Sequence, residues 1–410
     1  MDRYRGSCAF ARHFSLSGVG LLTSHPSLAM PFVEPPLLQP VREMAVNARC
    51  WCGSGLKWKK CHRDRDKQDE IPIGKLTADQ RAEYIRGRCL HPNAGPGSCG
   101  SIIRAHTVQR RGGIAAIAEN GHVISGKRGF EDIFKNEGAI IPREIGVNHA
   151  STFMGFCDTH DDQLFAPVEK SPVKLDKEAA FLLSFRAICY ESFQKDVAYR
   201  NIDIQRQIDK GKDFEIQCFV QQYLHVLREG MKRALRDLDE WKKAYDDAYR
   251  SGDYGKFSFY AVLFSDPLPL VACGAFHPEF DFGGNPLQII TRGENGFEHI
   301  CFNLTVVGGK SVAVFGRTGN IGGPAEQFIN SFRGLPKNVM ANATFHLACE
   351  YLENTYFRPS WWNGQTQEAR DHLISRFRSG VGTPGTERRA DCLSNLQFLF
   401  ATANVEQELS

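Results

Sequence analysis

Two groups of cysteine and histidine residues in the N-terminal part of the chain are spaced as metal ligands. The first group is compact, since Cys50, Cys52, Cys61 and His62 lie within one short run around a Gly-Ser-Gly turn. Three thiolates and one imidazole suit a closed tetrahedral zinc site. Glycine reaches positive φ at no steric cost, so the run can fold back tightly. A segment this small has no core of its own, and we expect the metal to supply most of its folding free energy.

This first group resembles the SEC-C motif, a small zinc module named from the C-terminus of the SecA preprotein translocase motor. The resemblance rests on the run Cys50-Trp51-Cys52-Gly53-Ser54-Gly55-Leu56-Lys57-Trp58-Lys59-Lys60-Cys61-His62. It implies a bound zinc ion and a contact surface rather than a reaction. Modules of this kind are found appended to varied bacterial proteins. We assign residues 44–68 to this zinc knuckle.

The second group of ligands is dispersed over two segments. Cys89 and Cys99 flank a loop rich in proline and glycine, while Cys157 and His160 are three residues apart and can share the first turn of a helix. Four ligands delivered by two segments describe a treble-clef-like zinc site, which we place in a module spanning residues 76–170. The alternative is that Cys99 and Cys157 are core thiols. With the knuckle, this interpretation predicts two structural zinc ions.

Residues 102–106 read as a short apolar strand that ends in a histidine. With the surrounding ligands, this strand resembles the HNH nuclease family, in which a zinc-braced strand pair and helix present a histidine as general base. The resemblance implies that His106 activates water as the general base, that Asn148 orients this base, and that His160 or Asp161 holds a catalytic Mg²⁺ or Mn²⁺. Because His160 cannot bind both the structural zinc and the catalytic ion, Asp161 is the remaining candidate ligand for the catalytic ion. The alternative is that His106 is a buried residue that braces the site.

Charge is spread unevenly along the chain. The net charge is +3, yet the segment from Met44 to Phe130 carries 16 Lys and Arg against 7 Asp and Glu. This asymmetry would suit a polyanionic partner, although a solvated basic face with no partner is the alternative. The partners we consider are nucleic acid, the ribosome or a protein.

The cysteines outside the two groups indicate a reducing compartment. Thirteen cysteines is an odd count for a disulfide scaffold. Most stand singly in apolar runs, as expected for buried free thiols; these are Cys189, Cys218, Cys273, Cys301, Cys349 and Cys392. No apolar stretch approaches the roughly 18 residues that a membrane span requires. We therefore predict a cytoplasmic protein without a membrane span.

The two ends of the chain differ in character. Residues 1–43 contain five prolines, scattered serines and only three acids, so we predict a disordered or targeting leader, or a non-native one if translation begins at Met44. From Leu175, helical periodicity predicts two long helices, separated near residues 210–212. Residues 256–318 alternate with period two and predict strands, with a hairpin turn at Gly308-Gly309. Helical patterns return after about Gly322.

The fold class we predict is α+β. Two small zinc-braced N-terminal modules precede a larger α+β domain, residues 175–410, with long helices and an antiparallel sheet. This domain shows no Ser-His-Asp pattern, no paired catalytic carboxylates and no dinucleotide fingerprint, and its role is not assigned. The first functional hypothesis is a zinc-binding interaction protein with a basic N-terminal surface. The second is an HNH-like metal-dependent endonuclease with His106 as general base.

Overall fold

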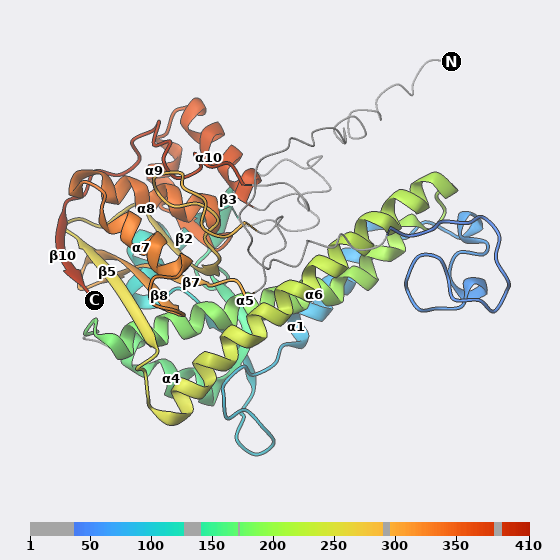
Figure 1. The fold of residues 1–410 in the computed structure, drawn as a ribbon, viewed down its shortest axis with the longest axis horizontal. Helices are drawn as coiled ribbons and strands as arrows, with labels where there is room; N and C mark the ends of the chain where they lie inside the picture. The colour runs from blue at the N-terminus through green and yellow to red at the C-terminus, as the bar shows by residue number, and fades with distance from the viewer. Residues whose placement is uncertain (1–36, 127–140, 171–172, 290–295, 381–387) are drawn as a thin grey trace, which may run out of the picture.

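An eight-stranded antiparallel sheet lies at the centre of the larger part of the molecule (Figure 1). The strand order is β10-β5-β8-β7-β6-β9-β2-β3. The bounds are β2 His122–Ser125, β3 Arg143–Gly146, β5 Phe257–Phe264, β6 Leu270–Phe276, β7 Ile300–Val307, β8 Lys310–Thr318, β9 Thr355–Phe357 and β10 Val405–Leu409. The structure is a computed structural model and describes residues 37–126, 141–170, 173–289, 296–380 and 388–410. Of the predicted leader, only residues 37–43 fall in this range.

Both faces of the sheet are covered, which explains why its central strands are apolar throughout. On β7, Phe302 and Leu304 enter one core, while Cys301, next to Phe302 in the chain, enters the other. Such alternation follows from the period of two in a strand. Helices α7 (Pro324–Arg333), α8 (Lys337–Tyr351) and α10 (Gln367–Gly380) contribute to the first core, and α5 (Lys177–Gln205) contributes to the second. The predicted α+β class with an antiparallel sheet is confirmed.

The hairpin predicted from Gly308-Gly309 joins β7 and β8. Val307 pairs with Lys310, and the two glycines between them have φ values of 59° and 81°. A two-residue turn with positive φ at both positions matches the twist of the flanking strands, and glycine adopts it without strain. The local sequence therefore determined this turn.

Strands β2 and β3 come from the range predicted as a separate module, residues 76–170. They pair with each other, and β2 joins the large sheet through β9, where Ile124 pairs with Phe357. The predicted module boundaries remain predictions, but the sheet itself includes strands from both sides of residue 170. Nothing in the local pattern announced this pairing, because β2 and β9 are short and more than two hundred residues apart.

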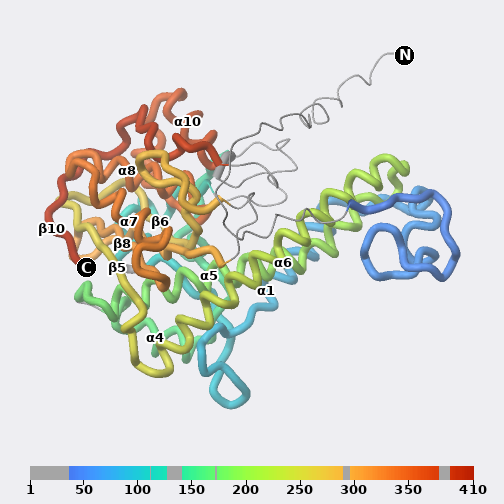
Figure 2. The backbone as a smooth tube through the Cα atoms, in the orientation of Figure 1, coloured from blue at the N-terminus to red at the C-terminus, as the bar shows by residue number. Residues whose placement is uncertain are grey.

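Two long helices form an arm that extends from the sheet (Figure 2). Helix α5 ends at Gln205, a 3-10 turn covers Arg206–Asp209, and α6 runs from Phe214 to Ser251. At 1.5 Å per residue, α6 is about 57 Å long. The knuckle lies at the end of the arm that is farthest from the sheet (Figure 1). Within the described ranges, no helix combines the length and apolar character needed to cross a membrane.

A small sheet and a helix surround the second group of predicted ligands. Strand β1 (Ile102–His106) pairs with β4 (Thr152–Cys157) in a separate two-stranded sheet, and α4 (Asp158–Glu169) follows directly. This unit packs on the same core as α5, through residues such as Phe153 and Phe156. The short helical segments are Trp58–Lys60, Arg65–Lys67, α1 Ile73–Arg86, Arg110–Ile114, α2 Ala115–Ile117 and α9 Pro359–Asn363.

The cysteines of the larger part are free thiols, as the sequence predicted. All twelve cysteines in the described part of the chain are free. Five of the six predicted core thiols are buried, and Cys218 on α6 is half-buried.

Candidate metal centres

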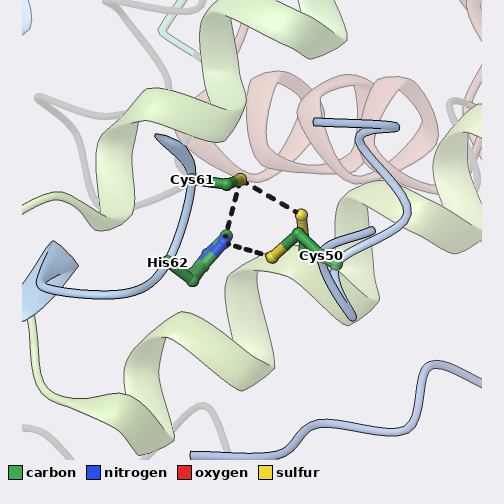
Figure 3. Close-up of side chains that lie close together, drawn as sticks. Cys50, Cys61 and His62 are labelled. Carbon is green, nitrogen blue, oxygen red and sulfur yellow. Dashed lines mark hydrogen bonds between the residues drawn. The ribbon is translucent and has the colours of Figure 1, made fainter. Parts of the chain in front are cut away.

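The four knuckle side chains converge on one point. Nδ1 of His62 lies 3.3 Å from Sγ of Cys50 and 3.2 Å from Sγ of Cys61, and Sγ of Cys52 lies 3.6 Å from Sγ of Cys61. Figure 3 shows Cys50, Cys61 and His62 pointing toward one another. Ligand atoms bonded at about 2.3 Å for sulfur and 2.0 Å for nitrogen to a tetrahedral zinc are about 3.5–3.8 Å apart. The donor set and its spacing therefore fit zinc.

Local turn chemistry brings these ligands together. Gly53 and Gly55 adopt φ values of 72° and 76°, and the chain folds back so that N of Cys50 donates to O of Leu56 at 2.8 Å. The 3-10 turn Trp58–Lys60 then delivers Cys61 and His62. Trp51 and Trp58 are buried with the ligand cysteines in a small cluster of their own. The knuckle has almost no other core.

Electrostatics at the knuckle favour a charged, deprotonated thiol next to a protonated imidazole when no metal competes. Burial lowers the pKa of His62, but its hydrogen bonds with Asp209, Cys52 and Cys61 outweigh that effect and raise the pKa to about 10. Hydrogen bonds from Cys50 and Cys61 lower the pKa of the Cys52 thiol. Because zinc binds thiolate and neutral imidazole, metal binding here must displace protons.

The second group also converges, although its members come from separate segments. Nδ1 of His160 lies 3.2 Å from Sγ of Cys157, 3.4 Å from Sγ of Cys89 and 3.6 Å from Sγ of Cys99. As at the knuckle, the four ligand atoms all lie within 4.8 Å of one another. These two are the only groups of three or more such ligands among the described residues. The second donor set, again three thiols and one imidazole, fits zinc for the same reason.

Backbone pairing positions the second group. Leu90 N donates to Gly155 O at 2.8 Å, which places Cys89 beside β4. Cys157 is the N-cap of α4, and its Sγ accepts from N of His160 at 3.4 Å. Cys157 and His160 are buried, whereas Cys89 and Cys99 are half-buried. The site thus lies nearer the surface than the knuckle site does.

One neighbour of the second group was not predicted. The ring of His91 stacks on the ring of His160, with centroids 4.0 Å apart and planes 5° from parallel. Nε2 of His91 lies 3.3 Å from the hydroxyl of Tyr249 on α6. Burial, with the nearby His160, lowers the pKa of His91 to about 4, so it is neutral at physiological pH. A neutral ring can stack on a ligand ring without charge repulsion.

The residues implied by the nuclease resemblance lie near this second site. His106 ends β1 and is half-buried, with Nε2 3.3 Å from the backbone O of Val147. Burial lowers the pKa of His106 and raises that of Asp161. The charges of Arg186 and Glu169, which form an ion pair, also influence the pKa values of both residues.

Asn148, the residue expected to orient His106, makes a hydrogen bond with another side chain. Its Oδ1 accepts a hydrogen bond from Arg110 at 2.7 Å, at the surface. The carbonyl of the preceding residue, Val147, makes the contact with the ring of His106. That Asn148 orients His106 therefore stays a prediction, and these hydrogen bonds do not join the two side chains.

Comparison with known proteins identifies the knuckle alone. Residues 47–64 match the SEC-C motif, which confirms the resemblance inferred from the sequence. No curated protein and no solved structure matches the chain. The SEC-C match and the two ligand groups are consistent with zinc binding.

Proposed function

We propose that this chain is a zinc-binding interaction protein whose knuckle binds a polyanion at the end of the α5–α6 arm. The observation that carries the proposal is a set of three exposed lysines, Lys57, Lys59 and Lys60, for which the described residues provide no ion pair. The arm holds them away from the sheet (Figure 1). A charged group without an internal partner is available to an external one.

The stretch of chain that carries these lysines contains charges of one sign only. From Met44 to Arg63 the chain contains five basic residues and no acidic one. All five are exposed: Arg49, Lys57, Lys59, Lys60 and Arg63. Such a cluster attracts phosphate groups over a distance of several ångströms and raises the association rate.

The aromatic residues of the knuckle support backbone contact rather than base reading. Trp51 and Trp58 are each only 8% exposed because they cover the metal ligands. They are therefore not free to stack on unpaired bases, which single-strand binding proteins commonly require. Nucleic acid bound through its phosphates is the partner we infer, and it includes the RNA of a ribosome.

Charge reversal of the three lysines tests this proposal. The triple variant Lys57→Glu, Lys59→Glu, Lys60→Glu should lose affinity for duplex DNA and for RNA. The triple change to Arg is the matched control and should keep it, because the charge is retained. For duplex DNA, removing three phosphate contacts should reduce the slope of log K against log salt by about three.

Several outcomes would contradict the proposal. One is that the wild-type chain fails to bind DNA, RNA or purified ribosomes at low salt. Another is that the Glu and Arg variants bind nucleic acid equally well. If the chain bound only an acidic protein, the lysine surface would remain the binding site, but the inferred partner, nucleic acid, would be wrong.

A second candidate function is metal-dependent cleavage of nucleic acid at His106. The observation that favours it is the order β1, β4, α4, with His106 at the end of β1 and one ring nitrogen on the Val147 carbonyl. A histidine that is fixed in this way and has a lowered pKa is neutral near pH 7, as a general base must be. Against it, neither convergent ligand group among the described residues includes His106 or Asp161.

Cleavage of plasmid DNA and of RNA in Mg²⁺ or Mn²⁺ tests this second candidate. His106→Ala and Asp161→Asn should each abolish cleavage, while Asp162→Asn, a change at the exposed neighbouring acid, should not. Absence of cleavage by the wild-type chain would leave the binding function alone.

A further inference from the structure

The outer shell of the knuckle site comes from a distant part of the chain. Nε2 of His62, the ring nitrogen that faces away from the cysteines, lies 3.1 Å from Oδ2 of Asp209. Asp209 ends the 3-10 turn between α5 and α6, 147 residues further along the chain, and its side chain is fully buried. A carboxylate on the second nitrogen of a ligand histidine fixes the tautomer and the ring orientation.

Asp209 is itself held in place on both oxygens. Nε of Arg65 donates to Oδ1 at 2.5 Å, and Nε2 of Gln221 on α6 donates to Oδ2 at 2.7 Å. Arg65 is only 4% exposed and Gln221 is fully buried. A buried carboxylate engaged on both oxygens is a rigid acceptor, since moving it would leave charged groups unpaired.

A buried arginine completes the contact between the arm and the knuckle. Nη1 of Arg206 donates to the backbone O of Cys52 at 2.8 Å and to Oε1 of Gln221 at 2.5 Å. Arg206 is 3% exposed, and among the described residues its Nε and Nη2 make no hydrogen bond, although Nε lies 3.8 Å from a carboxylate oxygen of the exposed Asp203. A buried guanidinium with unused donors is costly unless negative charge lies nearby.

Zinc bound by the knuckle ligands supplies that negative charge. Three thiolates and a neutral imidazole around a dication carry a net charge of minus one. Asp209 adds a second negative charge, and Arg65 and Arg206 add two positive ones. The charges of these buried groups therefore balance with zinc bound, whereas without zinc the four ligands add no net negative charge and two buried guanidinium groups accompany one buried carboxylate.

We infer that Asp209 and Arg206 are positioning residues of the knuckle metal site, and that zinc binding and docking of the knuckle on the arm are one equilibrium. Zinc then fixes the basic surface to the arm as well as folding the knuckle. This inference rests on zinc in the knuckle and not on the identity of the bound polyanion, so failure of nucleic-acid binding would leave it intact.

Zinc retention in substituted full-length protein tests the inference. In a chelator titration, Asp209→Asn should weaken knuckle zinc by about ten- to a hundredfold, the usual effect of losing such a partner. Arg206→Gln should weaken it in the same direction, and Arg206→Lys should restore part of the loss because it keeps the charge. Glu215→Gln is the matched control: Glu215 lies on the same end of the arm in an exposed ion pair with Arg42, and its variant should retain zinc as the wild type does.

Hydrogen exchange assigns the released zinc to its site and provides a test that needs no variant. When chelator removes knuckle zinc from the wild-type chain, amides in residues 44–63 and in residues 206–221 should lose protection together. Unchanged zinc retention in both Asp209→Asn and Arg206→Gln would overturn the inference. Loss of protection in residues 44–63 alone would overturn it as well.

Discussion

The two ligand groups each contain three cysteines and one histidine but are built in opposite ways. The knuckle ligands are contiguous in the sequence, are all buried and are surrounded by only a small cluster of their own. The second group is drawn from two separate segments, two of its cysteines are half-buried, and its strands pack on the large core shared with α5. The comparison teaches that identical ligands can play different structural parts.

The difference follows from where the folding free energy comes from. Of the five buried residues in the knuckle cluster, three are ligand cysteines, so the metal takes the place of a core. Around the second site, Phe153 and Phe156 are fully buried in a core that exists without metal. We therefore expect zinc to drive folding of the knuckle, whereas at the second site we expect zinc only to hold the loop of residues 89–99 against β1, β4 and α4.

The largest expected effect is that of Cys52→Ser. The variant should lose one zinc per chain and all exchange protection in residues 44–63, because structural zinc contributes on the order of 10 kcal/mol to folding such a module. Elemental analysis and hydrogen exchange measure both. Cys218→Ser, a change at a half-buried cysteine beside the knuckle that is not in the ligand group, is the control and should keep the full zinc content. A protected knuckle in Cys52→Ser would break the contrast.

Cys99→Ser should have a smaller effect on folding. One zinc should again be lost, and amides in residues 89–99 should exchange faster, yet β1 and β4 should stay paired because their core remains. Thermal unfolding of the sheet should shift by only a few degrees. If this variant instead unfolded β1 and β4, the second site would be as metal-dependent as the knuckle, and an unchanged zinc content would remove it as a metal site.

A pair of glycine substitutions compares the backbone near each site. Gly87, two residues before Cys89, has φ 53° and ψ 170°, and a Cβ there would lie 2.8 Å from O of Met154. Gly55 in the knuckle has φ 76° and no atom within 4 Å of such a Cβ. Gly87→Ala should cost about 3 kcal/mol in denaturant unfolding, while Gly55→Ala should cost about 1 kcal/mol, seen as weaker zinc retention. Equal costs would show that the crowding at Gly87 is relieved.

Mild acid should destabilise the body of the protein by a route that involves neither metal site. Burial lowers the pKa of His299 and of His346 to about 3, so both are neutral in the folded chain. The unfolded chain binds these protons below its pKa of about 6.5, so stability falls as pH drops from 6.5 toward 3, by on the order of 1 kcal/mol per histidine between pH 7 and pH 5.5.

His299→Phe separates this effect from acid release of zinc. Neither ring nitrogen of His299 has a hydrogen-bond partner among the described residues, and the ring stacks on Trp241. The variant should therefore keep its packing and lose one share of the pH dependence in thermal unfolding. An unchanged pH profile with unchanged zinc content would show that the metal sites, and not the buried histidines, set the acid stability.

Patterns of short range were the ones that could be predicted. The long helices, the turn at Gly308-Gly309 and the contiguous ligands of the knuckle all depend on neighbours within a few residues, so their spacing is visible in the chain. The second ligand group was found because Cys157 and His160 keep helical spacing and cysteine is rare enough to notice. By contrast, Asp209 is one aspartate among many in a polar turn, and no motif marks it.

The sequence by itself determined the short-range arrangement of the knuckle ligands. Residue type and turn chemistry bring Cys50, Cys52, Cys61 and His62 together wherever the segment lies in the fold. Only the tertiary structure decided what surrounds them. The contact of Asp209 and Arg206 with the knuckle depends on two helices closing over a buried charge cluster, and the pairing of β2 with β9 depends on the whole sheet. Such long-range contacts are selected by burial and charge compensation, which act between surfaces and leave no local spacing to read.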